Sequence, residues 1–406
     1  MTDRPDLGAA FAAAYPELAA VAAAAPDPVY LVGGAVRDLI LGRGRADIDL
    51  VVEGDPAALA AALGAEPLVT HPRFGTMKVD WNGEGLDLAA SRRESYARPG
   101  ALPTVELGAP IRTDLARRDF TVNAMAIPLA EPTELLDPYD GQVDLREGLL
   151  RAIHDRSFLD DPTRAIRAAR YAGRFGFELE PGTRDLLLAT DLGTVTPERR
   201  AEELRRLAAE ERGVRGLELL AGWGLVEPRP GGESFALARD VERLLATPAW
   251  AGEVDRPDAI LAAAGVLEAA PTDGREVGAI ESPGDEEEIS IPAAGADRSP
   301  AADSVFRRAA ELASARPARP SEGAALARGV DPLVLVLACG MGAGWLDDWL
   351  GWRQVRLEIG GADLTAAGLS GPAIGRGLDA ALAAKLDGEA PTRADELRVA
   401  LAAAAA

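Results

Sequence analysis

A short apolar run that stops at two glycines is the feature that most constrains the fold of this chain. Val29–Val32 has the composition of a buried strand, and Gly33-Gly34 then predicts a turn. Ala35–Leu41 has helix-compatible spacing and is followed by another glycine. Asp47–Val52 alternates acidic and apolar residues, as a half-buried strand does. The sequence therefore predicts a strand, a glycine turn, a helix and a second strand in direct succession.

Two more segments of the N-terminal part are predicted to be strands. They are Thr76–Trp81 and Leu86–Ala89, which Gly, Asn and Pro residues bound. Mixed strands and helices over residues 1–150 are typical of a compact α/β or α+β head. We expect the α+β class, with a mixed sheet in the head and helices in the rest of the chain.

The pattern becomes helical from about Asp161 onward. Asp161 is a suitable N-cap, Pro162 suits the first helical position, and the Ala-rich helix is expected to reach Phe175. Pro197 opens another helix in the same way. The sequence therefore predicts that a helical region follows the head.

We expect four segments along the chain. They are a head over 1–150, a helical neck and body over 151–245, an irregular region with an acidic linker over 246–310, and a helical tail over 311–406. The linker is placed at 271–303, where Pro, Gly and the acidic run Asp285–Glu288 are typical of disorder. The last alanines, Ala400–Ala406, are expected to fray and to have no function.

The composition excludes several kinds of site. Cys339 is the only cysteine, so neither an internal disulfide nor a Cys-rich metal cluster can form, which suits a reducing cytoplasm. His71 and His154 have no partner pattern and are interpreted as structural. The apolar runs are too short for a membrane span, and the N-terminus lacks a basic region leading into an apolar one. We therefore expect a cytoplasmic protein with no membrane contact, and the sequence leaves its oligomeric state open.

The charge is unevenly distributed along the chain. The net charge of −22 argues against broad nonspecific adhesion to nucleic acid, because phosphate binding needs local positive potential. Between Arg151 and Arg215, however, the chain contains thirteen Arg residues and twelve Asp or Glu residues. An Arg-rich groove can therefore exist inside an acidic protein.

Two aspartates follow the glycine turn on one face of a predicted strand. Asp47 and Asp49 are two residues apart, so both side chains leave the same face. Two carboxylates on one face attract a hard cation, and the N–H groups of Gly33-Gly34 and the helix start can hold a triphosphate. Each feature alone also fits an ordinary strand-to-helix turn or a solvated strand face. Together they predict a Mg²⁺ site for phosphoryl transfer, which needs neither histidine nor cysteine.

These residues lie in a segment with a strong family resemblance. LVGGAVRDLILGRGRADIDLVV resembles the catalytic motif of the class II tRNA nucleotidyltransferase and bacterial poly(A) polymerase family. The resemblance implies a polymerase β-like nucleotidyltransferase head, with Asp47 and Asp49 as metal ligands and Gly34 and Arg37 at the nucleotide phosphates. It covers residues 28–240 well and lapses through the acidic insert.

A second segment resembles the motif that contacts the incoming ribose and phosphates in this family. It is RRDFTVNAMA, in which Arg118 is the best binding candidate and Asp119 and Asn123 are implied ribose-side partners. The following segment, LLDPYDGQVDLREGLLR, resembles the family's hinge between head and neck. The resemblance therefore implies that the two halves can move during the nucleotide cycle.

The segment DDPTRAIRAARYAGRFGF resembles the family's base-reading motif. The family typically begins it with Glu-Asp, whereas this chain has Asp160-Asp161. The resemblance assigns base reading to Asp161 and Arg164. A carboxylate only accepts hydrogen bonds and a guanidinium only donates them, so the pair fits the amine and ring nitrogen of cytosine or adenine. Uracil and guanine present the opposite pattern and would be rejected.

Four arginines recur along the same predicted helix. Their spacing of three and four residues places Arg164, Arg167, Arg170 and Arg174 on one face, which is expected to line the nucleotide site. Without the resemblance, an N-cap role for Asp161 and a solvated arginine face would be the preferred interpretation. Tyr171 and Phe175 are more often helix core than base-stacking platforms. TPERRAEELRRL resembles a further motif that braces the neck.

Three features leave alternatives open. Asp87 is either a third carboxylate that assists deprotonation of the RNA hydroxyl or a charge at a strand end. SRRESYARPGALPTVE occupies the place of the family's mobile loop. Residues 357–392 resemble the tail that grips the tRNA elbow, where Gly371-Pro372 and Gly375 would approach RNA phosphate, but a helical packing module is comparably supported.

The sequence thus predicts a Mg²⁺-dependent enzyme that adds C, A or both to the 3′ end of tRNA without a template. Its expected partners are CTP, ATP and the 3′ end and elbow of tRNA. Poly(A) polymerase is the nearest alternative, although such enzymes usually carry a basic C-terminal extension and this chain ends in alanines. A catalytically silent RNA-binding protein is the alternative from another class.

Overall fold

The computed structural model describes residues 7–228, 234–266 and 300–405. Contacts divide the chain into two compact units, Met1–Val226 and Glu227–Ala406. Most of the predicted linker at 271–303 lies outside the described residues. Its last four residues belong to the helix α14, Pro300–Ser314.

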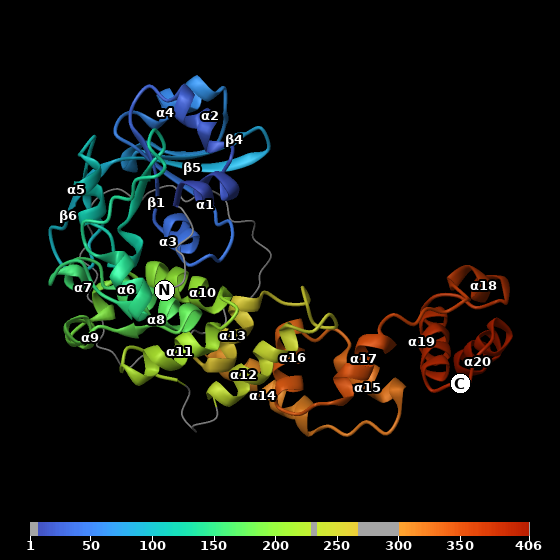
Figure 1. Cartoon of the computed structure of the whole chain (residues 1–406). Coiled ribbons are helices and arrows are strands. Elements are labelled where there is room, and N and C mark those ends of the chain that lie inside the picture. Colours follow the sequence, from blue (N-terminus) through green and yellow to red (C-terminus); the bar gives the residue numbers. More distant parts are fainter. Residues whose placement is uncertain (1–6, 229–233, 267–299, 406) are drawn as a thin grey trace. The chain divides into compact units, whose positions relative to one another are not determined.

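The first unit contains a six-stranded mixed sheet, as the sequence predicted (Figure 1). The strand order is β3-β4-β5-β2-β1-β8. The β2 and β5 strands are parallel, and all other neighbours are antiparallel. The strands are β1 Val29–Val32, β2 Ile48–Val52, β3 Glu66–His71, β4 Thr76–Trp81, β5 Glu84–Ala90 and β8 Ala126–Pro128.

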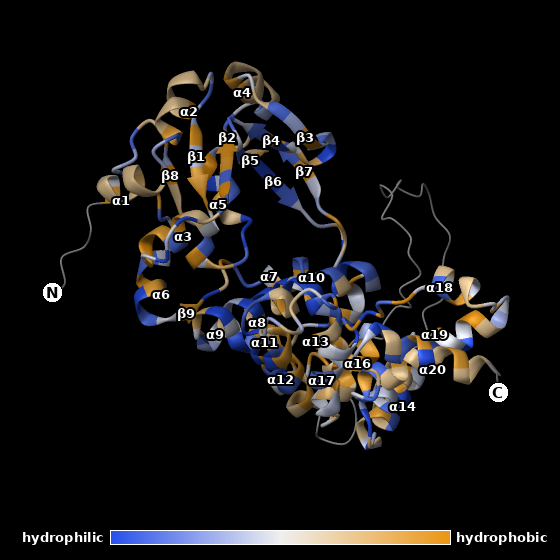
Figure 2. Cartoon of the chain, turned by 90° about the vertical axis from the view of Figure 1, so that its right-hand side faces the viewer, coloured by the Kyte–Doolittle hydropathy of each residue, from blue (hydrophilic) through white to orange (hydrophobic). Residues whose placement is uncertain are grey.

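Alternation along β2 separates the core from the site. Ile48 and Leu50 are buried in the main hydrophobic core with residues of the first helices. Asp49 has the opposite parity and shares its face with Val51, which packs in a smaller cluster with Leu115. Figure 2 shows β1 and β2 as largely hydrophobic strands. Four helices come before β3 in the chain: α1 Leu7–Ala14, α2 Leu18–Ala24, α3 Gly34–Ile40 and α4 Pro56–Leu63.

The turn between β1 and α3 forms at the predicted glycines. Gly33 has a φ of 66°, a conformation that favours glycine over residues with a Cβ. The predicted helix is present and begins one residue early, at Gly34. Because β1 and β2 are antiparallel, the turn ends β1 beside the start of β2.

Shorter elements complete the head. A hairpin of β6 Arg92–Ser95 and β7 Thr104–Leu107 occupies the segment predicted as a loop. The remaining elements are α5 Ile111–Ala116, α6 Gly141–Glu147, and β9 Leu149–Leu150, which pairs in parallel with β10 Glu178–Leu179. Short 3₁₀ turns lie at Pro72–Phe74, Thr121–Asn123 and Leu192–Thr194.

Helices form the neck of the first unit. They are α7 Ser157–Asp160, α8 Thr163–Phe175, α9 Pro181–Leu188, α10 Pro197–Ala209 and α11 Gly213–Gly222. The α8 helix begins at Thr163 with Pro162 as its N-cap residue, one position later than predicted. The Asp161 carboxylate nevertheless accepts from the backbone N–H of Thr163 at 3.2 Å. Gly176 adopts a left-handed conformation and ends α8 where the sequence predicted.

The described part of the second unit is helical. Its helices are α12 Ser234–Leu245, α13 Arg256–Ala264, α14 Pro300–Ser314, α15 Pro320–Ala327, α16 Pro332–Gly340, α17 Trp345–Trp352, α18 Gly361–Ala366, α19 Pro372–Leu386 and α20 Arg393–Ala405. Within 246–310, the described residues form turns over 246–255, the helix α13 and the start of α14.

The C-terminal alanines also differ from expectation. The α20 helix extends to Ala405, and Ala400 is 0% exposed in a small core with Leu364 and Ala381. Ala400 therefore does not fray, because it packs against α19 and α18.

Candidate active site

A cavity of about 1120 Å³ opens within the first unit. The sheet end, the glycine turn and the helices α8 and α10 all contribute to its lining. It collects every predicted site residue except Asp87: Gly33, Gly34, Arg37, Asp47, Asp49, Arg118, Asp119, Asn123, Asp161, Arg164, Arg167 and Arg170. The structure thus brings together residues from segments more than a hundred positions apart.

The sheet side of this cavity is acidic. Asp47 and Asp49 both line it, and the parallel pairing of β2 with β5 places Asp87 in register with Asp49. Burial and the negative charge of Asp87 raise the pKa of Asp49 to about 6. Asp87 lines an adjoining cavity of about 460 Å³, which Asp49 also lines, and lies 3.6 Å from Lys78. The three carboxylates therefore lie at the same end of neighbouring strands.

This donor set fits a hard divalent cation. The described residues include no group of three or more His, Cys, Asp or Glu side chains arranged as a metal-binding cluster. Mg²⁺ usually binds one or two carboxylates together with phosphate oxygens and water, so a complete protein cage is not required. Asp47 and Asp49 would hold it, and a cation would relieve the repulsion that raises the pKa of Asp49.

The glycine turn lies directly against Arg118. A Cβ atom at Gly33 would be 3.0 Å from Nη1 of Arg118, so the close approach depends on glycine. Nη2 of Arg118 donates to Asp114 at 3.0 Å, whereas its buried Nε has no hydrogen-bond partner among the described residues. An unpaired buried donor beside a glycine turn is suited to a phosphate oxygen.

A continuous polar network joins the turn helix to α8. Nη1 of Arg37 donates to Asn123 at 2.7 Å, and the amide nitrogen of Asn123 donates to Asp119 at 3.0 Å. Asp119 also accepts from Nε of Arg167 at 2.8 Å, and Nε of Arg37 donates to Asp38 at 2.8 Å. The network therefore alternates donors and acceptors across the cavity floor.

This network changes the interpretation of the predicted ribose partners. Asp119 is buried, and the guanidinium of Arg167 and the amide of Asn123 outweigh its desolvation and lower its pKa. Both polar atoms of the Asn123 amide already have partners. Asp119 and Asn123 thus hold neighbouring arginines in place, and in this arrangement neither presents an unpaired side-chain acceptor for a ribose.

Arg37 is similarly enclosed. It is 4% exposed and its guanidinium lies 4.5 Å from the centre of the Phe175 ring. Nη2, the nitrogen not used by Asp38 and Asn123, is the atom closest to a Cβ that Gly34 would carry. Tyr171 is buried in the core, as predicted, and also supports Arg37 and Arg170 through its ring.

The arginine face of α8 lines the cavity as predicted. Arg164 is buried and donates to Ser157 Oγ at 2.7 Å and to the backbone oxygen of Arg117 at 2.6 Å. Asp161 accepts from Thr163 Oγ1 at 2.7 Å and from Arg199 at 3.3 Å. The two predicted base-reading side chains therefore meet at one cavity wall, each held by neighbours from other elements.

Sequence reasoning missed several side chains that line the cavity. They include Arg92, Glu94 and Tyr96 from the β6 region and Arg199, Glu203 and Arg206 from α10. One carboxylate oxygen of Glu203 and Nε of Arg170 are buried without a hydrogen-bond partner within the described parts of the chain. The three-and-four-residue spacing of charges in TPERRAEELRRL was the available signal, but it was interpreted only as a brace.

The two histidines differ in their surroundings. Burial lowers the pKa of His154, which agrees with a structural role. His71 lies at the end of β3 and lines the smaller cavity near Asp87 and Lys78. Neither histidine lines the main cavity.

Comparison with known proteins agrees with this geometry. The family model for the poly(A) polymerase head domain matches residues 29–151. The solved Thermotoga maritima CCA-adding enzyme complexed with tRNA superposes with a TM-score of 0.70 at 26% identity, covering 98% of each chain. The head, residues 29–151, belongs to the poly(A) polymerase head-domain family, and the whole chain shares its fold with that CCA-adding enzyme. Enzymes of this nucleotidyltransferase family generally depend on a divalent metal.

Curated tRNA nucleotidyltransferases match part of the chain. The A-adding tRNA nucleotidyltransferase of Halalkalibacterium halodurans is 44% identical over 190 residues, which are 43% of this chain and 44% of that protein. The CC-adding enzyme of Deinococcus radiodurans is 40% identical over 246 residues, or 58% of this chain and 62% of that protein. The matches therefore span less than two thirds of the length of these curated relatives.

No single helix in the described parts of the chain is long and apolar enough to cross a bilayer. Only α1 and α2 taken together reach the required length and composition, and the pair is bent by 95°.

Proposed function

We propose that this chain adds C, A or both to the 3′ end of tRNA, without a nucleic-acid template and with Mg²⁺ as the metal. The observation that carries the proposal is the single cavity that contains paired carboxylates, a glycine turn with a free arginine donor, and the Asp161 and Arg164 pair. Class II relatives named for A addition and for CC addition to tRNA support the same substrates. We place the activity in the cytoplasm.

Different residues of the cavity would bind the metal and the triphosphate. Asp47 and Asp49 would hold the metal, and Mg²⁺ bound there would activate the RNA 3′-hydroxyl and stabilise the departing pyrophosphate. The backbone of Gly33 and Gly34 and the free Nε of Arg118 would bind the triphosphate. Asp87, aligned with Asp49 across the sheet, would accept the proton of the RNA hydroxyl.

Base choice would depend on fixed donors and acceptors. Arg164 is anchored by Ser157 and the Arg117 carbonyl, and Asp161 is anchored by Thr163 and Arg199. Anchoring keeps the donor and the acceptor apart at a set spacing, so the pair can select the edge shared by cytosine and adenine. Residues 357–392 would contact the tRNA elbow. The α19 segment within this range begins at Pro372, directly after Gly371.

The product is decided by an end-sequencing experiment. Purified full-length protein is supplied with Mg²⁺, CTP and ATP and with tRNA that lacks CCA, CA or A, and the 3′ ends are sequenced. C or A addition to these tRNAs supports the proposal and identifies the CC-adding, A-adding or CCA-adding reaction. Long homopolymer tails on unstructured RNA would indicate poly(A) polymerase instead. Tight tRNA binding without any incorporation would indicate a silent RNA-binding protein.

A further inference from the structure

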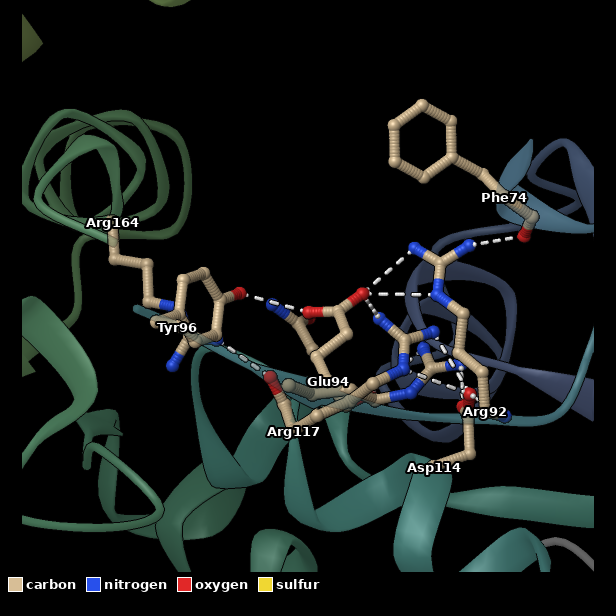
Figure 3. Close-up of polar contacts among 9 residues, drawn as sticks. Phe74, Arg92, Glu94, Tyr96, Asp114, Arg117 and Arg164 are labelled. Atoms are coloured by element: carbon tan, nitrogen blue, oxygen red, sulfur yellow. Dashed lines mark hydrogen bonds and ion pairs between the residues drawn. The ribbon is translucent and has the colours of Figure 1, made fainter. Parts of the chain in front are cut away.

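Arg118 contacts a group of charged side chains that the proposed function does not use. Figure 3 shows Arg92, Glu94, Asp114 and Arg117 of this group. The support cluster, as we call it, consists of Asp114 on α5, Arg92 and Glu94 on β6, and Arg117. Figure 3 shows the Glu94 carboxylate between Tyr96 on one side and the Arg92 and Arg117 guanidinium groups on the other. The cluster therefore connects the β6–β7 hairpin with the residue before Arg118.

Asp114 is the centre of the support cluster. It is 0% exposed, its Oδ2 accepts from Nη2 of Arg118 at 3.0 Å, and its Oδ1 accepts from Nε of Arg117 at 2.9 Å. The backbone N–H of Arg92 also donates to Oδ1, at 3.3 Å. Burial raises the pKa of Asp114, but the guanidinium groups of Arg118 and Arg117 outweigh it and lower that pKa overall. Asp114 is therefore an ionised acceptor that two adjacent arginines share.

Glu94 forms the outer part of the support cluster. Its Oε1 accepts from Nε of Arg92 and from Nη1 of Arg117, both at 2.9 Å. Its Oε2 accepts from the Tyr96 hydroxyl at 2.8 Å. Because burial and Glu94 raise the pKa of Tyr96, that hydroxyl remains a donor at neutral pH. Glu94 thus fixes the far side of Arg117, while Asp114 fixes its near side.

These contacts determine the orientation of Arg118. Its guanidinium is held at Nη2 by Asp114, and Nη1 donates to the backbone oxygen of Asn123 at 3.5 Å. Nε is the one nitrogen of this guanidinium that has no hydrogen-bond partner among the described residues, and it is buried in a side chain that lies against the Gly33 turn. Arg118 has many rotamers of similar energy, so a fixed anchor is needed to keep this donor at the turn.

We propose that Asp114 is a positioning residue that holds Arg118 at the glycine turn to receive a triphosphate, and that Glu94 supports it through Arg117. The inference rests on the proposed function, because it assumes that a nucleoside triphosphate enters this cavity. Neither Asp114 nor Glu94 is expected to touch the nucleotide base, so base choice is left to Asp161 and Arg164.

The sign of the effect separates positioning from simple electrostatics. A carboxylate near a triphosphate repels it, so removing the charge of Asp114 should strengthen anion binding if nothing else changed. If Asp114 positions Arg118, its loss should weaken binding, because the arginine can leave the turn. The two explanations therefore predict changes in opposite directions for the same substitution.

The test measures the affinity of the full-length protein for inorganic tripolyphosphate by calorimetry. We expect Asp114→Asn to weaken binding about tenfold, the size of one charge-assisted hydrogen bond. In an Arg118→Ala background, the same substitution should cause no further loss. An unchanged or stronger affinity in Asp114→Asn, or an equal loss in the Arg118→Ala background, would overturn the inference.

A second variant and a matched control cover the risk of misfolding. Glu94→Gln should weaken tripolyphosphate binding about threefold while leaving Asp114 in place, and an affinity equal to wild type would overturn the part assigned to Glu94. Asp144→Asn removes an equally buried carboxylate that pairs with Arg151 outside the cavity, and it should leave the affinity unchanged. Thermal unfolding of all variants checks that they remain folded.

CTP and ATP binding by the wild-type chain keeps the two proposals separate. A wild-type chain that bound neither nucleotide would overturn both proposals. A chain that bound them but lost no triphosphate affinity on Asp114→Asn would overturn only the inference about Asp114.

Discussion

The sheet side and the α8 side of the cavity treat their acidic residues in opposite ways. On the sheet side, burial and Asp87 raise the pKa of Asp49 to about 6, and Arg118 and Lys78 only partly offset them. Near α8, Asp119 is also buried, yet Arg167 and Asn123 lower its pKa below the ordinary range. Burial raises the pKa of both carboxyls, but the net outcome differs according to whether the fold supplies enough positive charge to outweigh it.

This difference indicates what each side is for. A buried carboxylate that pairs with an arginine of the same chain has a structural role, and Asp119 is therefore assigned to holding Arg167. A carboxyl whose raised pKa the cations of the chain offset only in part is suited to bind an external cation. We assign Asp49 to Mg²⁺ on that basis. Four substitutions test the contrast, and they follow from the largest expected effect to the smallest.

The largest effect is expected for Asp49, the carboxylate assigned to Mg²⁺. Asp49→Ala should lower nucleotide incorporation at least about a thousandfold, because metal-dependent stabilisation of the transition state amounts to several kcal/mol. Labelled CTP and ATP incorporation into tRNA measures the loss. Asp185→Ala, at an exposed position on α9 outside the cavity, is the control and should retain full activity. Wild-type turnover in Asp49→Ala would refute the metal assignment.

The next largest effect is expected for Asp119, whose carboxylate pairs with Arg167. Asp119→Asn should lower the free energy of unfolding by about 3 kcal/mol at pH 7, because the partly buried guanidinium of Arg167 then loses its buried carboxylate partner. Since the pKa of Asp119 is lowered by folding, this stability is present above the ordinary pKa of an aspartate and is lost as the pH falls below it. Urea unfolding between pH 3 and pH 7 would measure it; a difference between variant and wild type that did not shrink toward acid would contradict the pairing.

A smaller effect is expected for base selection. Arg164→Ala should reduce the preference for CTP and ATP over UTP and GTP by about thirtyfold, roughly 2 kcal/mol, before transfer itself is lost. Competition assays with all four nucleotides measure the preference. Arg184→Ala, an exposed arginine of α9, serves as the control. Unchanged selectivity in Arg164→Ala would remove the base-reading role.

The smallest effect returns to Asp49 without metal. Because folding raises its pKa from 3.8 to about 6, the folded chain binds the proton more tightly, and stability falls as the pH rises through that interval. Asp49→Asn should therefore stabilise the metal-free protein by about 1 kcal/mol above pH 6, a value discounted for partial exposure. Thermal unfolding in a chelator measures this. Added Mg²⁺ should then stabilise the wild type more than the variant.

Local sequence patterns predicted much of the fold, and together with the family resemblance they identified part of the cavity lining. The strands β1 and β4 lie where alternation and turn residues placed them, and α8 ends at Phe175 as expected. The position of Asp49 also follows from short-range alternation. These features depend on neighbours a few residues away, which a single sequence displays directly.

Partnerships across long separations could not be predicted in the same way. Asp119 meets Arg167 across 48 positions, and Arg199 meets Asp161 across 38. Nothing in either local pattern says which acid pairs with which arginine, so neither ion pair was predicted. The burial of Ala400 was missed for the same reason, since its neighbours come from α18 and α19.

The parallel pairing of β2 with β5 has a consequence for how this chain can vary. The pairing fixes Asp49 beside Asp87 through the ladder itself, and the residues between the two strands form α4, β3 and β4 at the outer edge of the sheet. Insertions in the connections of that outer part would leave the ladder intact. One residue gained or lost inside β2 or β5 would instead turn the carboxylates to opposite faces. Length changes should therefore be tolerated between these strands and harmful within them.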